Sequence, residues 1–385
     1  MQQRAISWIA RRLRRSREWV HKWIRRYRQG GPTWFLERSR RPHPMARRVS
    51  ATFEQAVIRA HARLTSPRNP LGFYGAEAIA QELADAGVHP VHSIRTIHRI
   101  LARHKLVTRT RRDRSRRGPH LPTPPARRLN DVHQLDFIVG HYLAAQRPVV
   151  IVNRKDMATG LVGGAEEPDR RVQRGLAFLT RDWHRHGRPR FLQMDNDMSL
   201  TGGRFHPRRL GQLIRFCLAC RVIPVFTPER QPAANARVER YNGLWQEKVW
   251  QRYRFRTLRH LRVRSHAFQV AYNTYLTRRL IRQGHHTRLN GLQRPLPVPF
   301  RVPTPLPLYR GQSWVIRRVD EEGHIQVLNE TIQLPIRYAP AYVRVVIRTG
   351  PQTLSVYWIA SQHVRLKRIA HRAYRLREQA RTPLL

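Results

Sequence analysis

A change of hydrophobic pattern near residue 129 constrains the fold of this chain more than any other feature. Three strand-like runs follow one another from there, DVHQLDFIVGHYL, RPVVIVNRKD and TGLVGGAEE. Beyond them, helical and strand-like stretches alternate up to about residue 260. Three consecutive strands followed by alternating helices and strands indicate a mixed sheet covered by helices. We therefore expect an α/β core with a mixed five-stranded sheet at 129–260.

A first helical module is expected at 1–38, ahead of the core. ISWIARRL repeats apolar residues at helical spacing, and Ser16 stands at a good N-cap position for a second helix that ends at Gly30-Gly31. Two helices joined by a tight turn, the second rich in Arg, are typical of a helix-turn-helix. An ordinary basic helical hairpin is the alternative. Because a supporting helix normally precedes such a pair, we expect the module to be truncated at its N terminus.

A second helical module is expected at 51–108. It holds three helical stretches, TFEQAVIRAHARL, YGAEAIAQELADAG and SIRTIHRILARHKL. Ser93 stands where it can cap the last and most basic of them, and Gly87 and Pro90 separate that helix from its neighbour. This pattern predicts a winged-helix-like module that binds DNA.

Proline-rich and basic stretches divide the rest of the chain. Residues 109–128 contain almost no apolar side chains, which predicts an extended basic linker. A helix and a Pro-rich linker are expected at 261–310. Short alternating runs bounded by Gly, Asn and Pro at 311–358 predict a small all-β barrel, and the basic end of the chain, 359–385, is expected to be a helical tail.

The charge of the chain indicates a polyanionic partner. Its 385 residues include 74 Lys+Arg against 24 Asp+Glu, a formal net charge of +50. Such an excess destabilises a compact state by self-repulsion unless a polyanion neutralises it, so nucleic acid is the leading partner. The basic residues are spread over the whole length, which argues against a basic tail on a neutral enzyme. A GC-rich genome is an alternative source of part of the Arg excess.

Several classes of protein are disfavoured by what the sequence lacks. Cys217 and Cys220 stand three apart on an apolar helical face without a second pair at zinc spacing, so core packing is favoured over metal binding and a disulfide framework is not indicated. No run approaches eighteen apolar residues, and no Gly-rich phosphate loop of Walker type is present. We expect a cytoplasmic, nucleoid-associated protein without a membrane partner.

Three acids in the core segment form a candidate metal site. Asp136 lies inside an apolar strand-like run, where a carboxylate is costly unless it faces a cation. Asp195 ends the next buried strand at its carboxyl end, where α/β sheets place ligands. Glu239 lies about one turn into the helix after VIPVFTP and can reach back over the sheet. Convergent acids bind paired divalent cations in phosphoryl chemistry, with Mg²⁺ favoured and Mn²⁺ as a substitute. Unrelated surface acids are the alternative.

The motifs around these acids resemble those of a known family. Asn196 stands beside Asp195, and the turn PxxNxxVERxN precedes the helix with Glu239. Through QLDF, MDND and QPAANARVERYNG, the segment from about 129 to 260 resembles the retroviral-integrase-like core of DDE transposases from bacterial insertion sequences, a ribonuclease H-like fold. The N-terminal helix-turn-helix with its ERSRRPH linker and the β-domain expected at 311–358 are also similar to parts of those proteins.

The resemblance implies roles for particular residues. Asp136, Asp195 and Glu239 would be the catalytic triad and would bind two Mg²⁺ or Mn²⁺ ions, while Asn196 and Asn235 would shape the site. Basic side chains of the helical modules and of the site's rim are expected to contact DNA: Arg17, Lys22, Arg25, Arg26, Arg95, Arg99, Arg237 and Arg240.

The family also implies a function. The protein would be a DNA transposase or integrase that cuts the ends of an element and transfers the strand into target DNA, working as a homo-oligomer on terminal repeats. A catalytically inactive, domesticated sequence-specific DNA-binding protein is the main alternative. A ribonuclease H-type nuclease acting on RNA–DNA hybrids shares the core but has less use for two helical modules.

Three departures from the family pattern bear on that alternative. Asp197 stands where the family usually has Gly after Asp195-Asn196, and Ala236 replaces the Gly that usually follows Asn235. The interval between Asp195 and Glu239 is also longer than is common, with MSLTGGRFHP as the expected inserted loop. The triad itself is intact, so an active enzyme is the favoured interpretation.

Overall fold

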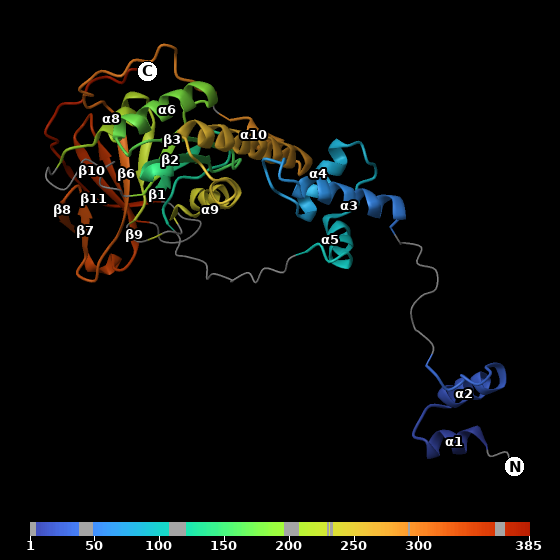
Figure 1. Ribbon diagram of the computed structural model, residues 1–385. Helices are drawn as coiled ribbons and strands as arrows, with labels where there is room; N and C mark the ends of the chain where they lie inside the picture. The colour runs from blue at the N-terminus through green and yellow to red at the C-terminus, as the bar shows by residue number, and fades with distance from the viewer. Residues whose placement is uncertain are drawn as a thin grey trace. The chain divides into compact units, whose positions relative to one another are not determined.

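The computed structural model describes residues 5–37, 49–107, 121–195, 208–228, 231, 234–291, 293–358 and 366–385. The chain separates into two compact units, 1–54 and 55–385. Figure 1 shows the helices and strands of both. None of the helices in these ranges is both long and apolar enough to cross a membrane.

The first unit contains the expected pair of helices. They are α1 (Ile6–Arg12) and α2 (Arg17–Gln29). The Ser16 hydroxyl accepts a hydrogen bond from the Trp19 amide at 3.1 Å, so the predicted N-cap of α2 is confirmed. Aromatic side chains of α2 and of the turn after it contact one another, with 5.7 Å between the Trp19 and Trp23 ring centroids. Contacts between aromatic rings therefore contribute much of the packing of this helix pair, because few of its described side chains are fully buried.

The second helical module consists of α3 (Ala51–Thr65), α4 (Ala76–Asp85) and α5 (Ile94–Arg103). Ser93 caps α5 as predicted, accepting a hydrogen bond from the Thr96 amide at 3.2 Å. The described residues 49–107 contain no strand, so the expected winged-helix form is wrong there. The physical reason is that no alternating apolar run follows α5 from which a wing could be built.

The strands form one continuous sheet in the order β11-β10-β9-β6-β5-β4-β1-β2-β3. β1 pairs antiparallel with β2 and parallel with β4, and β4 pairs parallel with β5. The five strands expected for the core are therefore contiguous within a larger mixed sheet. Their bounds are β1 (Val132–Leu143), β2 (Arg147–Asp156), β3 (Val162–Glu167), β4 (Phe191–Met194), β5 (Ile223–Phe226), β6 (Gln312–Arg318), β9 (Tyr342–Arg348), β10 (Thr353–Trp358) and β11 (Lys367–Ala373).

The expectation of a separate C-terminal barrel is wrong. β6 pairs parallel with β5, with Val225 opposite Trp314, and this pairing extends the core sheet into the C-terminal strands. Without β6, the apolar edge strand β5 would expose unpaired backbone groups, a liability that pairing removes. Only the hairpin of β7 (His324–Val327) and β8 (Glu330–Gln333) forms a separate small sheet among the described residues.

The expected helical tail at 359–385 is also wrong for its described part. Residues 366–385 contain strand β11, which pairs antiparallel with β10, and no helix. The pairing satisfies the backbone groups of β10 that would otherwise form the sheet's open edge. That gain depends on a neighbouring strand, so the local basic pattern could not reveal it.

Helices cover both faces of the sheet (Figure 1). α6 (Val172–His186) and α8 (Gln212–Ala219) pack on one face. On the other lie α9 (Ala236–Trp245), which continues as a π-helical turn over Gln246–Trp250, and α10 (Leu258–Arg282). Short 3-10 turns complete the described elements at Ala144–Gln146, His286–Leu289 and Ile336–Tyr338.

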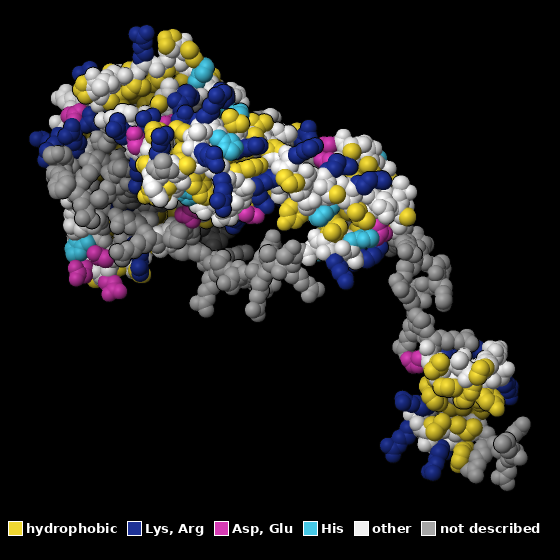
Figure 2. Space-filling model, in the orientation of Figure 1, with side chains coloured by type: hydrophobic (Ala, Val, Ile, Leu, Met, Phe, Trp, Pro, Cys, Tyr) yellow, Lys and Arg dark blue, Asp and Glu magenta, His cyan; other side chains and the backbone are white. Residues whose placement is uncertain are grey.

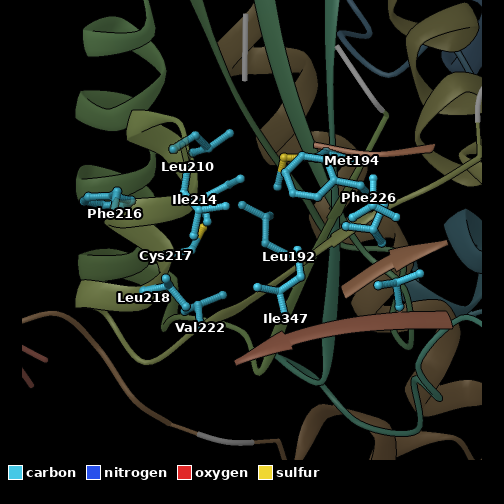
Figure 3. Packing of buried hydrophobic residues seen from close by; sticks show 14 of the residues in the cluster. Leu192, Met194, Leu210, Ile214, Phe216, Cys217, Leu218, Val222, Phe226 and Ile347 are labelled. Atoms are coloured by element: carbon cyan, nitrogen blue, oxygen red, sulfur yellow. The ribbon is translucent and has the colours of Figure 1, made fainter. Parts of the chain in front are cut away.

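One apolar core joins the central strands to the C-terminal ones. Figure 3 shows Ile214 of α8 near Leu192 of β4, Phe226 of β5 and Ile347 of β9, all of which belong to a single buried cluster. Cys217 also lies in this cluster, and both cysteines are free and buried, so the prediction that they pack in the core is confirmed.

The Pro-rich stretch expected to be a linker packs against the α6 and α8 layer. Leu306 and Leu308 are buried in the same core. The Arg215 guanidinium donates to the Leu306 carbonyl at 3.1 Å, and a ring nitrogen of His184 lies 2.9 Å from the Leu296 carbonyl oxygen. This stretch therefore packs against the helical layer instead of forming a free linker, because its leucines are buried in the apolar core.

Candidate functional site

Two matching Gln-x-Asp segments place the first two acids on one face of the sheet. Gln134 of β1 is paired in register with Gln193 of β4. Asp136 stands two residues beyond Gln134, and Asp195 stands two residues beyond Gln193, directly after β4. Paired residues, and residues two apart on a strand, point to the same face. The two aspartates therefore occupy neighbouring positions at the carboxyl end of β4.

Two buried glutamines fix the helix that carries the third acid. The side-chain amides of Gln134 and Gln193 both donate to the Ala234 carbonyl, each at 2.8 Å. The Gln134 side-chain oxygen also accepts a hydrogen bond from the Val238 amide at 3.1 Å, which caps α9 from a neighbouring strand. Glu239 is the next residue of that helix. The first turn of α9 is thus anchored over the same strands that carry the aspartates.

A chain of amides holds the carboxylate of Asp136. One oxygen accepts from the Phe137 amide at 2.9 Å, and the other accepts from the Asn242 side chain at 2.7 Å. The Asn153 side chain in turn donates to the Asn242 oxygen at 2.8 Å. A carboxylate offers about four lone-pair sites, so these two contacts orient Asp136 while leaving it able to accept from a ligand.

The sequence interpretation assigned no role to Asn242 or Asn153. The pattern PxxNxxVERxN ends on Asn242, which stands three residues after Glu239 and so shares its side of the helix. That spacing was the available signal. Asn153 stands opposite Asp136 in the β1–β2 register, a pairing that a sequence pattern does not disclose.

The three acids influence one another's ionisation. Burial, helped by the negative charges of Asp195 and Glu239, raises the pKa of Asp136 from 3.8 to about 6. The pKa of Glu239 is raised by desolvation and then by Asp195, and desolvation also raises the pKa of Asp195. The side chains of Asp195 and Glu239 reach solvent, yet nearby chain atoms displace enough water to disfavour their charge. A cation would relieve this shared repulsion.

Arg170 is a further charged group of the site that the sequence interpretation missed. Its positive charge lowers the pKa of Asp136 and of Asp195, which opposes the effect of burial. Its guanidinium lies 5.7 Å from the centre of the Phe137 ring, next to Asp136 in the chain. It belongs to the turn between β3 and α6, and only the three-dimensional arrangement brings it to the acids.

The chemistry of the donors fits a hard divalent cation. Carboxylate oxygens are the ligands that Mg²⁺ and Mn²⁺ prefer, and three mutually repelling acids favour a bound positive charge. Across the described ranges, which omit 196–207, no group of three or more His, Cys, Asp or Glu side chains is gathered closely enough to hold a metal ion. The metal site on the three acids therefore stays a prediction.

The two predicted site-shaping asparagines have different outcomes. Asn235 is buried at the start of α9, and its side-chain oxygen lies 3.4 Å from the Gln193 amide nitrogen. It makes no cap to its own helix, because Gln134 fills that role. Asn196 lies outside the described residues, as do Asp197 and the expected inserted loop.

The rim arginines on α9 are exposed beside a buried lysine. Arg237 donates to the Met157 carbonyl, and Arg240 is exposed one residue after Glu239. Burial, together with the charges of Arg237 and Arg240, lowers the pKa of Lys155 to about 8. The ammonium lies 3.3 Å from the Tyr272 hydroxyl. A positive field therefore borders the carboxylates on this side.

The predicted DNA-binding residues of the helical modules lie on their surfaces. On α2, Arg17, Lys22 and Arg25 are exposed, while Arg26 is partly buried with its guanidinium 4.8 Å from the Trp23 ring centre. Arg95 and Arg99 are exposed on α5, whose opposite side buries apolar residues. Figure 2 shows Lys and Arg side chains distributed over the visible surface of the described chain.

The C-terminal strands add basic and aromatic side chains to the face that carries the acids. The register runs from Gln193 through Val225 and Trp314 to Val346, so Trp314 shares the aspartates' face. The Arg344 guanidinium lies 4.0 Å from the Trp314 ring centre on that face. Farther out, a hydrogen bond with Arg348 lowers the pKa of Tyr357. The same sheet face thus carries acids at its middle and Arg344 toward its C-terminal edge, where Arg344 is buried and donates to the Pro122 carbonyl at 2.9 Å. 

Comparison with known families finds a DNA-binding type of domain in the helical part. A family model described as a homeodomain-like domain matches residues 19–101, from α2 to α5, which is less than half of the chain. No curated protein matches the chain.

Solved structures give distant similarities. One is a chain from the simian T-cell lymphotropic virus intasome in complex with PP2A regulatory subunit B56 gamma, at 14% identity over 79% of this chain and 99% of that one, with a TM-score of 0.33. Another is the HTLV-2 integrase catalytic core domain in complex with magnesium in its dimeric form, at 16% identity over 40% of this chain and 88% of that one, with a TM-score of 0.28. The trimeric form gives 16% identity over 37% and 84%, with a TM-score of 0.27.

Proposed function

We propose that this chain is a metal-dependent polynucleotidyl transferase that cuts DNA and joins the cut strand to a target, as transposases and integrases do. One observation carries the proposal: the pairing of Gln134 with Gln193 sets Asp136 and Asp195 side by side on one face of the sheet, and Gln134 anchors over them the first turn of α9, which bears Glu239. A shared carboxylate site in a chain with a net charge of +50 suits a reaction on a nucleic-acid phosphate.

Asp136, Asp195 and Glu239 would hold two Mg²⁺ ions, or Mn²⁺ as a substitute. When bound, the ions would stabilise the charge that develops on the attacking and leaving oxygens of the phosphate. The neighbouring side chains support this role by fixing donors in place: Asn242 orients Asp136, and Gln134 holds the turn of α9 that carries Glu239.

The remaining charges would position DNA. Arg170 acts on the ionisation of Asp136, and Arg240 directly follows Glu239 in α9, so either guanidinium could contact a phosphate next to the reacting one. The helical modules would bind the terminal repeats of a bacterial insertion sequence, which the homeodomain-like match supports. The basic C-terminal part of the chain would hold flanking or target DNA, and the protein would act as a homo-oligomer that brings two DNA ends together.

A strand-transfer assay tests the proposal. Purified protein is incubated with a labelled DNA fragment carrying the repeats that flank its gene, in Mg²⁺ or Mn²⁺, beside the Asp136→Asn and Glu239→Gln variants. The native chain should give joined products and both variants should not. Glu247→Gln is the matched control, because Glu247 lies in the π-helical turn after α9 and pairs with its neighbour Lys248.

Two other results would redirect the assignment. Full strand transfer by Glu239→Gln would refute the catalytic role of that residue. Metal-independent footprints without any nicking by the native chain would favour the alternative, an inactive sequence-specific DNA-binding protein.

A further inference from the structure

Helix α4 of the second helical module is tied to α10 by charged side chains. Arg278 of α10 pairs with Asp85, and Arg279 pairs with Glu77 at 2.7 Å. The Gln283 side chain also donates to Glu77 at 3.1 Å. Partly exposed ion pairs of this kind are individually weak, but a group of them on facing helices fixes a register.

One arginine contacts three backbone carbonyls of the turn between α3 and α4. Arg252, which follows the π-helical turn, donates to the carbonyls of Ser66, Pro67 and Asn69 at 3.3, 2.6 and 2.7 Å. Three backbone contacts from one guanidinium leave little freedom for the turn, because the planar group orients all of its donors together.

Apolar contacts close the same junction. Leu71 is buried in the core under α9 and α10, together with Tyr241 and Trp245. Phe73 packs edge-on against Tyr275, with 5.3 Å between the ring centroids. Residues of the turn thus belong to the core under α9 and α10. Burial of aromatic and Leu side chains stabilises this junction far more than the ion pairs do.

Helix α10 connects this junction to the sheet that bears the three acids' strands. The Asn273 side chain donates to the Val162 carbonyl of β3 and accepts from the Val162 amide, both at 2.8 Å. An α-helix of this length is a stiff element. The second helical module and the strands that bear the acids are therefore connected through packed side chains as well as through the chain itself.

Helices α4 and α5 of the second helical module carry opposite charges. Helix α4 holds Glu77, Glu82 and Asp85 in a chain that has only 24 acidic residues, and two of these three pair with α10. Helix α5 exposes Arg95 and Arg99 instead. The acidic helix is thus committed to the catalytic unit, while the basic helix stays available to DNA.

We propose that this junction acts as a ruler: it fixes the number of base pairs between the DNA sequence bound by α5 and the bond that is cut at the acids. The inference rests on the proposed function. It goes beyond that function because it makes α4 and α10 positioning elements that determine where a strand is cut, and assigns this role to Glu77, Asp85, Arg278 and Arg279.

The test compares three full-length variants with the native protein. The loosened variant carries Glu77→Arg and Asp85→Arg, which place like charges against α10. The charge-swapped variant adds Arg278→Glu and Arg279→Glu, which restores opposite charges. A control with Glu321→Arg and Glu322→Arg in the turn before β7 makes the same change of net charge at exposed positions away from the junction.

Cleavage is mapped to the nucleotide on DNA in which the bound sequence is moved by about five and about ten base pairs, half a helical turn and one turn. The native, control and charge-swapped proteins should cut at one constant offset from the bound sequence. The loosened variant should bind equally well but cut at several offsets. A single unchanged offset in the loosened variant would overturn the ruler.

A distance measurement separates failure of the ruler from failure of the proposed function. Spin labels on His98→Cys in α5 and Glu321→Cys near β7 report the distance distribution in DNA-free protein, since the two native cysteines are buried. The ruler predicts a narrow distribution in the native protein and a broad one in the loosened variant. A broad distance distribution in the native protein overturns the ruler alone. A narrow distribution without cleavage by any of the proteins overturns the proposed function, and with it the ruler's effect on cutting.

Discussion

At the scale of single residues, the candidate site depends on how Asp136 is held and charged. Its carboxylate is oriented by the Asn242 amide and lies near two other acids, whose charges add to the effect of burial on its pKa. Orientation and ionisation are separate properties. Each can be changed by a substitution that leaves the other acids in place.

Replacing Asn242 should weaken metal use more than folding. Asn242→Leu removes the donor to Asp136 and leaves the amide of Asn153 without its acceptor. Loss of such an outer contact typically costs about 10–100-fold in metal affinity or activity. We expect a higher Mn²⁺ requirement for strand transfer, with partial recovery in Asn242→Ser. An unchanged metal requirement would show that the amide only fills space.

Asp136 should make the folded state less stable as pH rises. Its pKa is raised from 3.8 to about 6, so between these values the folded state binds more protons than the unfolded state. Stability of the metal-free protein should therefore fall as pH rises through this window. Asp136→Asn removes the effect. The melting temperature of this variant minus that of the native chain should therefore increase from pH 4 to pH 7 in EDTA. A constant difference across this range would contradict the raised pKa.

At the scale of elements, α9 is positioned by side chains of two parallel strands. Gln134 makes two contacts to the helix start, with the Ala234 carbonyl and the Val238 amide, while Gln193 makes its short contact with the Ala234 carbonyl alone. The two glutamines are therefore not equivalent, although both belong to Gln-x-Asp segments. The difference can be measured.

Gln134→Leu should destabilise the chain more than Gln193→Leu. The first change leaves the Val238 amide without its cap, a loss that typically costs about 1 kcal/mol, in addition to one donor to Ala234. After the second change, Gln134 still satisfies the Ala234 carbonyl. Denaturant unfolding of both variants checks the order. Equal losses, or a larger loss for Gln193→Leu, would argue against capping from β1.

At the scale of the whole molecule, the central and C-terminal strands form one folding unit. Val315 of β6 and Val345 of β9 lie in the same buried cluster as Leu192 of β4 and Phe226 of β5. β6 also covers the edge of β5. The β-rich end of the chain is therefore part of the same core as the strands that carry the acids.

Truncation before β6 should abolish folding. A chain ending at residue 305 loses the partner of β5 and much of the shared core, so it should aggregate through the exposed edge. A chain of residues 49–385, which keeps the second compact unit complete, should remain folded. Soluble yield, size-exclusion chromatography and a cooperative thermal transition provide the measurement. A soluble, cooperatively melting chain that ends at residue 305 would refute the single folding unit.

The amino-acid sequence by itself determined the local features of this protein. Helical spacing located α2 and α5, and Ser16 and Ser93 cap them as predicted. Alternating and apolar runs located the five central strands, and the position of Asp136 and Asp195 within those runs follows directly. These features depend on neighbours within a few residues, which is the range over which periodicity and capping act.

Only the tertiary structure decided how distant segments meet. The pairing of β6 with β5, the contact of Gln134 with Ala234 and the docking of α4 on α10 each join residues far apart in the chain. A local pattern shows that a strand has an apolar face or an open edge, but several partners could satisfy that edge equally well. The choice is made by the packing of the whole core, because only the complete fold buries all of these surfaces together.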